Sequence, residues 1–347
     1  MPETRRRRRP VLRDERITLA HGAGGKATRD LVEALFLEEL GNDALAPLGD
    51  SAVLTTPPGR VAFTTDSYVV RPLSFPGGNI GELAVNGTVN DLAVAGARPL
   101  WLAAGFVVEE GLPVAGLRDL VRSLAGAAER ASVAVAAGDT KVVERGKADG
   151  LYVTTAGIGV LEHDLVLEPS RVQPGDRVLL SGSLADHGMA VMIARGDLRL
   201  EGDVASDTAP IHELAASLLA LGGALRWMRD PTRGGLATAL NELAAQSALA
   251  VRLREEAIPV RPAVTAACEI LGIDPLYVAN EGKLVAIVAE NAAAEALRLL
   301  REHPLGAGAV EIGVVEPEPE SMVLLDTALG GSRIVDLLVG DPLPRIC

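Results

Sequence analysis

The sequence predicts an α+β protein built from two domains. Its 347 residues are enough for two domains of roughly 150 residues each. Apolar residues make up 48% of the chain and charged residues 23%, which is typical of a soluble globular protein and excludes disorder as the main state. Stretches with the apolar pattern of a strand alternate with stretches of helical periodicity throughout the chain. We therefore expect helices and strands in both halves.

In the first half, a glycine-dense loop leads into a helix, and strands and helices then alternate. Apolar residues at helical spacing support these assignments. Leu117, Leu120, Val121 and Leu124, for example, form one stripe. We expect helices at residues 30–39, 81–95 and 114–131, and strands at 61–70, 100–108, 133–137 and 151–160.

A turn cluster at residues 171–176 precedes a short apolar strand and marks the expected domain boundary. Asp230, Pro231 and Thr232 form a start signal for a helix at residue 234. The second half is expected to contain helices at 186–194, 211–221, 234–247, 262–271 and 292–301, and strands at 178–180, 250–253, 284–289, 310–315 and 321–325. The expected division is a disordered Arg-rich tail (1–16), a first domain (17–170), a second domain (171–335) and a mobile tail (336–347).

Charge and cysteine content narrow the class of protein. The formal net charge of −13 argues against nucleic acid as the main partner, which needs a positive surface. No stretch reaches about 18 apolar residues, so we expect no transmembrane helix. The five arginines at 5–9 are followed by no apolar segment and therefore form no secretory signal. Two cysteines indicate a reducing compartment, and so the cytoplasm.

A glycine-dense loop at residues 21–26 is the first candidate binding element. The usual nucleotide signatures, G-x-x-x-x-G-K-[ST] and G-x-G-x-x-G, are missing from the sequence. The backbone N–H groups of Gly24 and Gly25 can approach phosphate oxygens closely, and Lys26 can add positive charge. The alternative is a flexible hinge.

Several acidic residues of the first half are expected at turns or strand ends, namely Asp50, Asp66, Asp91 and Asp139. An acid that ends an apolar strand is a common way to hold Mg²⁺ beside a phosphate. Any one of them alone is more often a helix cap or a turn former. Together with Asn86 and Asn90, which lie four residues apart on one helix face, they favour a magnesium–nucleotide site.

Lys141 and Glu281 each lie at a polar break beside an apolar strand. A carboxylate and an amine near a phosphate site can act as base and as electrostatic stabiliser. The alternative is two surface charges in loops. We interpret His187 and His212 as structural or surface residues, and Cys268 as a buried, inert residue of a helix.

Cys347, the last residue, follows Pro342 and Pro344. A prenylated cysteine would stand four residues from the end, so that use is excluded. The nearby terminal carboxylate keeps its expected pKa at or above about 8.5. The thiol could serve as a swinging carrier, because the chain from Gly340 spans up to about 25 Å when extended.

Eight short segments, which follow one another from about residue 17 to the end of the chain, form one ordered set of motifs. They are 21–26, 49–52, 65–66, 86–92, 137–141, 230–235, 280–283 and 344–347. Together they resemble the HypE family of hydrogenase maturation proteins, the carbamoyl dehydratases. The 86–92 and 230–235 segments resemble mainly the wider superfamily of aminoimidazole ribonucleotide synthetase, selenophosphate synthetase and thiamine monophosphate kinase. The terminal Pro-Arg-Ile-Cys points to HypE in particular.

The resemblance implies a two-domain aminoimidazole ribonucleotide synthetase-like fold, in which the first domains of two subunits pair and ATP binds near that interface. It implies that the carbamoyltransferase HypF loads a carbamoyl group onto Cys347. The chain then dehydrates this group to a thiocyanate, using ATP. The cyanide passes to the iron held by the HypC–HypD complex, for a [NiFe]-hydrogenase.

Dehydration of a carbamoyl group must expel oxygen, which is a poor leaving group. Transfer of the γ-phosphoryl group of ATP lets that oxygen leave as phosphate, and a base then removes the N–H protons; Mg²⁺ neutralises charge. We expect Glu281 as the base and Lys141 as the stabilising charge, although these two roles could be exchanged. The metal candidates are Asp50, Asp66 and Asp91. The nucleotide-binding candidates are Gly24, Gly25, Lys26, Asp50, Asp66, Asn90, Asp91, Gly138 and Asp139.

Two alternatives remain. The chain could be another ATP-dependent member of the superfamily, such as selenophosphate synthetase or thiamine monophosphate kinase. Neither needs a terminal thiol, and the glycine loop has no cysteine to handle selenium. The chain could also be a non-enzymatic scaffold whose tail carries a cyano group made elsewhere.

Overall fold

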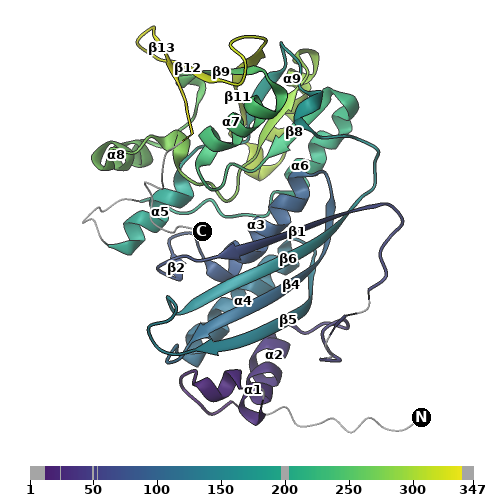
Figure 1. The fold of residues 1–347 in the computed structure, drawn as a ribbon, viewed down its shortest axis with the longest axis vertical. Helices are drawn as coiled ribbons and strands as arrows, with labels where there is room; N and C mark the ends of the chain where they lie inside the picture. The colour runs from purple at the N-terminus through teal and green to yellow at the C-terminus, as the bar shows by residue number, and fades with distance from the viewer. Residues whose placement is uncertain (1–11, 24, 49–50, 53, 197–202, 338–347) are drawn as a thin grey trace.

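The computed structural model describes residues 12–23, 25–48, 51–52, 54–196 and 203–337. The first half forms a four-stranded sheet with two helices on one face (Figure 1). The strand order is β1-β6-β4-β5, in which β4 and β5 are parallel and the other pairs antiparallel. The strands are β1 (Arg60–Tyr68), β4 (Arg98–Glu109), β5 (Ala134–Val143) and β6 (Leu151–Leu161).

Helix α4 (Val114–Arg130) connects the two parallel strands and packs beside α3 (Ile80–Val94). The predicted apolar stripe of α4, which includes Leu117, Val121 and Leu124, is buried against the sheet and α3. This confirms that the helical periodicity of the sequence marks the face turned to the core.

Helix α3 is the most buried helix of the first half. Asn79 caps its first turn: the side-chain oxygen of this residue accepts hydrogen bonds from the N–H groups of Gly81 and Glu82. Nearly every residue of α3 is buried, because the sheet covers one side and helix α6 and strand β8 of the second half approach the other. In Figure 1, α3 lies where the two halves of the molecule meet.

The second half forms a seven-stranded sheet of order β13-β12-β9-β11-β7-β10-β8. Helices α6 and α9 cover one face of it, and α5 and α7 pack with α8 on the other. The strands are β7 (Arg177–Leu180), β8 (Leu225–Arg229), β9 (Ala250–Arg254), β10 (Val285–Val288), β11 (Val310–Glu316), β12 (Val323–Asp326) and β13 (Ser332–Ile334). The helices are α5 (Asp186–Arg195), α6 (His212–Leu218), α7 (Gly235–Ser247), α8 (Pro262–Leu271) and α9 (Ala293–Glu302).

Short elements complete the structure. Before the first sheet, α1 (Lys26–Leu31) and α2 (Leu37–Leu40) are joined by a π-helical turn, Val32–Phe36. A small hairpin, β2 (Ser74–Phe75) and β3 (Gly78–Asn79), precedes α3. Short 3₁₀ turns occur at Leu19–Gly22, Pro169–Arg171, Leu219–Ala224, Glu255–Ala257, Pro275–Tyr277, Glu290–Ala292 and Pro304–Gly306. Within the described ranges, every helix is too short or too polar to cross a membrane.

The structure confirms the expected mixture of helices and sheet, and it corrects several local assignments. Strand β5 continues to Val143, whereas we expected it to end at residue 137. Asp91 lies inside α3 and not at a turn or strand end. The sequence patterns did not predict the strands β2, β3, β8 and β13, because these strands are short or lack an alternation of apolar and polar residues.

The expected tails lie mostly outside the described residues. Within the part that is described, Glu15 accepts a backbone hydrogen bond from Val114, and Arg16 donates to the Gly111 carbonyl. These residues therefore contact the β4–α4 connection, where we had expected a disordered tail. The division between residues 170 and 171 stays a prediction; the first sheet ends at Leu161 and the second begins at Arg177.

The close contact of α3 with α4 predicts an effect on stability. A Cβ at Gly81 would overlap the carbonyl oxygen of Leu120. We expect Gly81→Ala to lower the free energy of unfolding by about 1–3 kcal/mol, because the helices must separate. Gly126→Ala on α4 is the control, since the nearest atom is the flexible end of Arg130, 3.5 Å away. Urea unfolding should show an unchanged or slightly higher stability for the control; equal losses in both variants would contradict this packing argument.

Candidate active site

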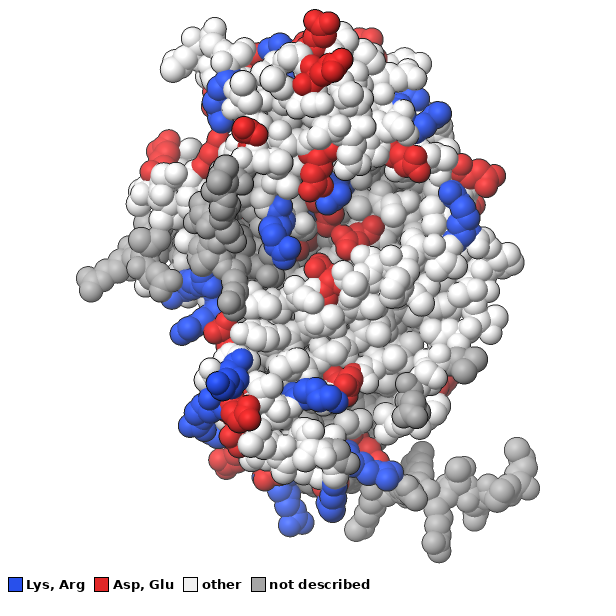
Figure 2. All heavy atoms as spheres, in the orientation of Figure 1, with Lys and Arg blue, Asp and Glu red and all other residues white. Residues whose placement is uncertain are grey.

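Acidic side chains from distant parts of the chain meet where the two halves join. They are Asp66 on β1, Asp91 on α3, Asp230 directly after β8, and Glu281 in the loop before β10. Their charges act on one another, since those of Asp66, Asp91 and Asp230 all contribute to the pKa of Glu281. Figure 2 shows acidic side chains gathered in a hollow between the two halves.

Burial and mutual repulsion raise the pKa values in this cluster. Burial raises the pKa of Asp230 to about 7, and the charge of Asp91 adds to this effect. The pKa of Glu281, whose side chain is only 2% exposed, lies well above its usual range, first because of burial and then because of Asp230. A carboxyl group with a pKa of about 7, such as that of Asp230, can exchange protons near neutral pH, as a general base or acid requires.

Asp91 is oriented by a neighbouring strand. The hydroxyl group of Thr64 on β1 donates a hydrogen bond of 2.8 Å to its Oδ2 atom. Burial raises the pKa of Asp91, and this hydrogen bond works against the shift. Thr64 and Asp66 stand two residues apart on the strand, so both face the helix side of the sheet. The candidates Asp66 and Asp91 therefore do lie near each other.

Asn90 contacts backbone groups of the second half with both ends of its amide. Its Nδ2 atom donates to the carbonyl oxygens of Ala209 and Glu281, each at 3.1 Å, and its Oδ1 atom accepts from the Ile211 N–H at 2.8 Å. The side chain is 1% exposed. The structure thus places this nucleotide-binding candidate as a link that holds the Glu281 loop.

Lys141 and Asp139 lie on the other face of the first sheet. They form an ion pair of 2.9 Å within β5, opposite Val107 and Gly105 of β4. Across the four strands, Asp66 is in register with Ala104 and Gly138, so these residues face the same side of the sheet. Side chains alternate along a strand, so Asp139 and Lys141 face the opposite side. Within one chain, the structure does not bring Lys141 to Glu281.

The glycine loop lies beside α1. Gly25 precedes the helix, and Lys26, its first residue, forms an ion pair with Asp30 one turn later. Lys26 also lines a cavity of about 650 Å³ together with Arg13, Asp14 and His21. The candidates Gly24, Asp50 and Cys347 lie outside the described residues.

The junction cluster is also the place where a metal ion could be held. Carboxylate oxygens are suitable ligands for Mg²⁺, and a bound cation would reduce the repulsion between buried carboxylates. In the described parts of the chain, no group of three or more Asp, Glu, His or Cys side chains is arranged so that it could hold a metal ion by itself. The arrangement fits an ion held by one or two carboxylates, with water and phosphate oxygens as its other ligands.

The comparisons with known proteins agree with this architecture. The models of the N-terminal and C-terminal domains of AIR synthase related proteins match residues 48–161 and 173–326. The carbamoyl dehydratase HypE of Bradyrhizobium diazoefficiens is 53% identical over 337 residues, which cover 97% of each chain. The chain belongs to the HypE carbamoyl dehydratase family. It has the two-domain fold that the AIR synthase related models describe.

Solved structures of HypE proteins superpose closely on this chain. HypE in complex with ATP is 45% identical, with a TM-score of 0.91 over 95% of this chain and 99% of that one. HypE in a HypE–HypF complex is 44% identical, with a TM-score of 0.78 over 90% of this chain and 100% of that one. A thiamine-monophosphate kinase from Stenotrophomonas maltophilia shares the fold alone, at 20% identity and a TM-score of 0.62.

Sequence reasoning did not identify Asp230 as a residue of the site. We took Asp230-Pro231-Thr232 as a helix start, yet the acid directly follows strand β8 and lies 5% exposed beside Asp91 and Asp66. Recognition of β8 would have marked it as an acid at a strand end.

The pKa of Asp230 predicts a dependence of stability on pH. Its folded-state value of about 7 lies above the unfolded value of about 3.9, so the folded chain binds more protons between these limits. Stability without metal should therefore fall as the pH rises through this window, with at most about 4 kcal/mol from this group. We expect Asp230→Asn to flatten the slope in urea unfolding at pH 5 to 8 with a chelator. A slope equal to that of the unaltered chain would contradict the assignment.

Proposed function

We propose that this chain dehydrates an S-carbamoyl group on its own Cys347 to a thiocyanate, with ATP as the phosphoryl donor. The observation that carries the proposal is the match to carbamoyl dehydratase HypE over nearly the full length, including the HypE–ATP structure. In balanced form, the thiocarbamate and ATP give the thiocyanate, ADP and phosphate. The carbamoyl oxygen leaves in the phosphate, and both N–H protons are released.

Glu281 is the proposed base for these protons. Its burial and its acidic neighbours raise its pKa, which makes its carboxylate a stronger base than an exposed one. Burial also excludes water, which would otherwise compete for the activated carbamoyl carbon. The loop that carries it is held at its backbone by Asn90.

Asp66 and Asp91 are the proposed holders of Mg²⁺, together with Asp50. The ion would supply charge neutralisation for the transferring phosphoryl group. Thr64 keeps the Asp91 carboxylate turned toward β1. Gly24, Gly25 and Lys26 are proposed to cover the phosphates. Gly138 and Asp139, which face opposite sides of β5, are also proposed to contact the nucleotide.

A homodimer through the first sheet is proposed from its outward face. Val61 and Phe63 on β1 are 53% and 70% exposed, although both are large and apolar. Phe63 pairs with Ile158 on β6, which pairs in turn with Trp101 on β4. Both of these neighbours are only partly buried. In Figure 2 this area is broad and almost free of charge. A second copy could cover it, and Lys141, on the same face, would then lie at the dimer interface near which the nucleotide is proposed to bind.

HypF is the proposed source of the carbamoyl group, since a relative 44% identical to this chain was solved in a HypE–HypF complex. The HypC–HypD complex is the proposed acceptor of the cyanide. We place these steps in the cytoplasm, in line with the two cysteines of the chain.

The mass of the chain after reaction tests the function. The carbamoylated chain should lose one water when ATP and Mg²⁺ are added, and Cys347→Ser should show no change at all. Glu281→Gln and Lys141→Ala should slow this loss by about 10²-fold or more while ATP affinity changes little, because both act on the reacting group.

The control for these two variants is Lys147→Ala, an exposed lysine that follows β5. It should react at the normal rate. A chain that gains a cyano group only from another protein would support the scaffold alternative. Equal losses of rate and ATP affinity would show that Glu281 and Lys141 bind the nucleotide instead.

The exposed sheet face predicts a change of oligomeric state. In sedimentation experiments the unaltered chain should be a dimer, and Phe63→Glu should be a folded monomer, because a charge cannot be buried there without a partner. Ile270→Glu on α8 is the matched control, since this side chain is also 66% exposed but lies in the second domain. A dimeric Phe63→Glu would exclude this pairing.

A further inference from the structure

The peptide groups on both sides of Glu281 are held by side chains. Its N–H donates to Oδ1 of Asp207 at 3.2 Å, and its carbonyl oxygen accepts from Nδ2 of Asn90 at 3.1 Å. Asn90 comes from α3 of the first domain, and Asp207 lies in the connection between α5 and α6. Glu281 is therefore held by residues from both domains.

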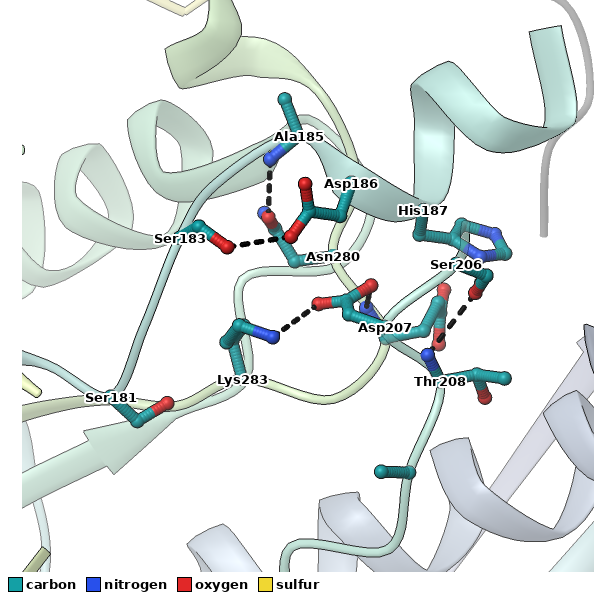
Figure 3. Close-up of polar contacts among 12 residues, drawn as sticks. Ser181, Ser183, Ala185, Asp186, His187, Ser206, Asp207, Thr208, Asn280 and Lys283 are labelled. Atoms are coloured by element: carbon teal, nitrogen blue, oxygen red, sulfur yellow. Dashed lines mark hydrogen bonds and ion pairs between the residues drawn. The ribbon is translucent and has the colours of Figure 1, made fainter. Parts of the chain in front are cut away.

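Asp207 in turn forms a buried ion pair with Lys283, two residues after Glu281. The Lys283 Nζ atom lies 3.1 Å from Oδ2 of Asp207, and the two side chains are 12% and 5% exposed. Figure 3 shows the lysine reaching across its own loop to this carboxylate. A single carboxylate thus binds the backbone at residue 281 with one oxygen and the amine of residue 283 with the other.

The packing around the pair leaves little freedom. A Cβ at Gly282 would overlap the carbonyl oxygen of Asp207, and a Cβ at Gly182 would lie 2.9 Å from Cε of Lys283. The side chain of the preceding residue, Asn280, accepts from the Ala185 N–H at 2.8 Å and donates to the Pro231 carbonyl at 2.9 Å. The loop from 280 to 283 is confined at every residue.

We propose that Asp207 and Lys283 are positioning residues for the dehydration, which hold the Glu281 carboxylate at the reacting carbamoyl group. The inference rests on the proposed function, in which Glu281 is the base. Neither residue needs to touch the substrate. They act through the backbone of the loop, and the ionised acceptor makes the hydrogen bond to the Glu281 N–H stronger than a neutral one would be.

The charges around the pair support an ionised Asp207. Its burial opposes ionisation, but Lys283 and then His187 on α5 bring its pKa below the usual value. The other charged groups that face Glu281 are carboxylates, namely Asp230, Asp66 and Asp91. A buried ion pair contributes little to stability by itself, because desolvation offsets the attraction. Its presence at this point is better explained by the geometry that it imposes on Glu281.

The test compares Lys283→Met, Asp207→Asn and the double variant in the full-length chain. ATP affinity is measured by calorimetry, dehydration of the carbamoylated chain by its mass, and folding by thermal unfolding. We expect dehydration to slow about 10- to 100-fold in every variant, because small displacements of a reacting group have effects of this size. ATP affinity should stay within about threefold. Arg252→Met, which breaks the ion pairs to Glu316 and Asp326 on the second sheet, is the control with a normal rate.

The double variant separates positioning from folding. It leaves no unpaired buried charge, so its melting temperature should be closer to that of the unaltered chain than those of the single variants, and the effects on rate should not add. A double variant that is stable and still slow supports positioning. One that regains the normal rate, or variants that lose ATP affinity as much as rate, would overturn it. An unaltered chain that loses no water would overturn the proposed function itself, and the inference with it.

Discussion

The hydrogen bonds of Asn90 connect the two domains at the site. This side chain belongs to α3 but contacts backbone groups of Ala209, Ile211 and Glu281 in the second domain. The groups at Ile211 and Glu281 are buried, and buried polar groups are costly to leave unpaired. The position of Glu281 relative to Asp66 and Asp91 therefore depends on how the domains are joined, and a shift between them would separate the acidic residues.

The acidic junction is electrostatically costly for the folded chain. Burial first, and then repulsion between the carboxylates, raises the pKa values of Asp91, Asp230 and Glu281. The chain also has a formal net charge of −13, so positive charge is scarce. Such a cluster is an unfavourable choice for stability alone. It is suited to a site that receives a cation and a proton during its reaction.

The sequence patterns were reliable where they concern one element at a time. The periodicity of α3 and α4 and the apolar strands of both sheets are local properties, and the structure has these elements close to the expected residues. The same local reasoning placed Asp139 and Lys141 wrongly at the end of a strand, since both lie inside β5. A glycine followed by charged residues resembles the end of a strand, but β5 is an edge strand with one exposed face, where polar side chains are tolerated.

The sequence alone determined the fold class, the order of most elements and the family, because periodicity and short motifs are written along the chain. It also singled out Asp66, Asp91 and Glu281 by residue type. Only the tertiary structure decided which of these residues meet, that Asp230 joins them, and that Asp207 and Lys283 hold the Glu281 loop. These contacts join residues far apart in the chain, and their pairing follows from the packing of α3 between two domains, which no local pattern encodes.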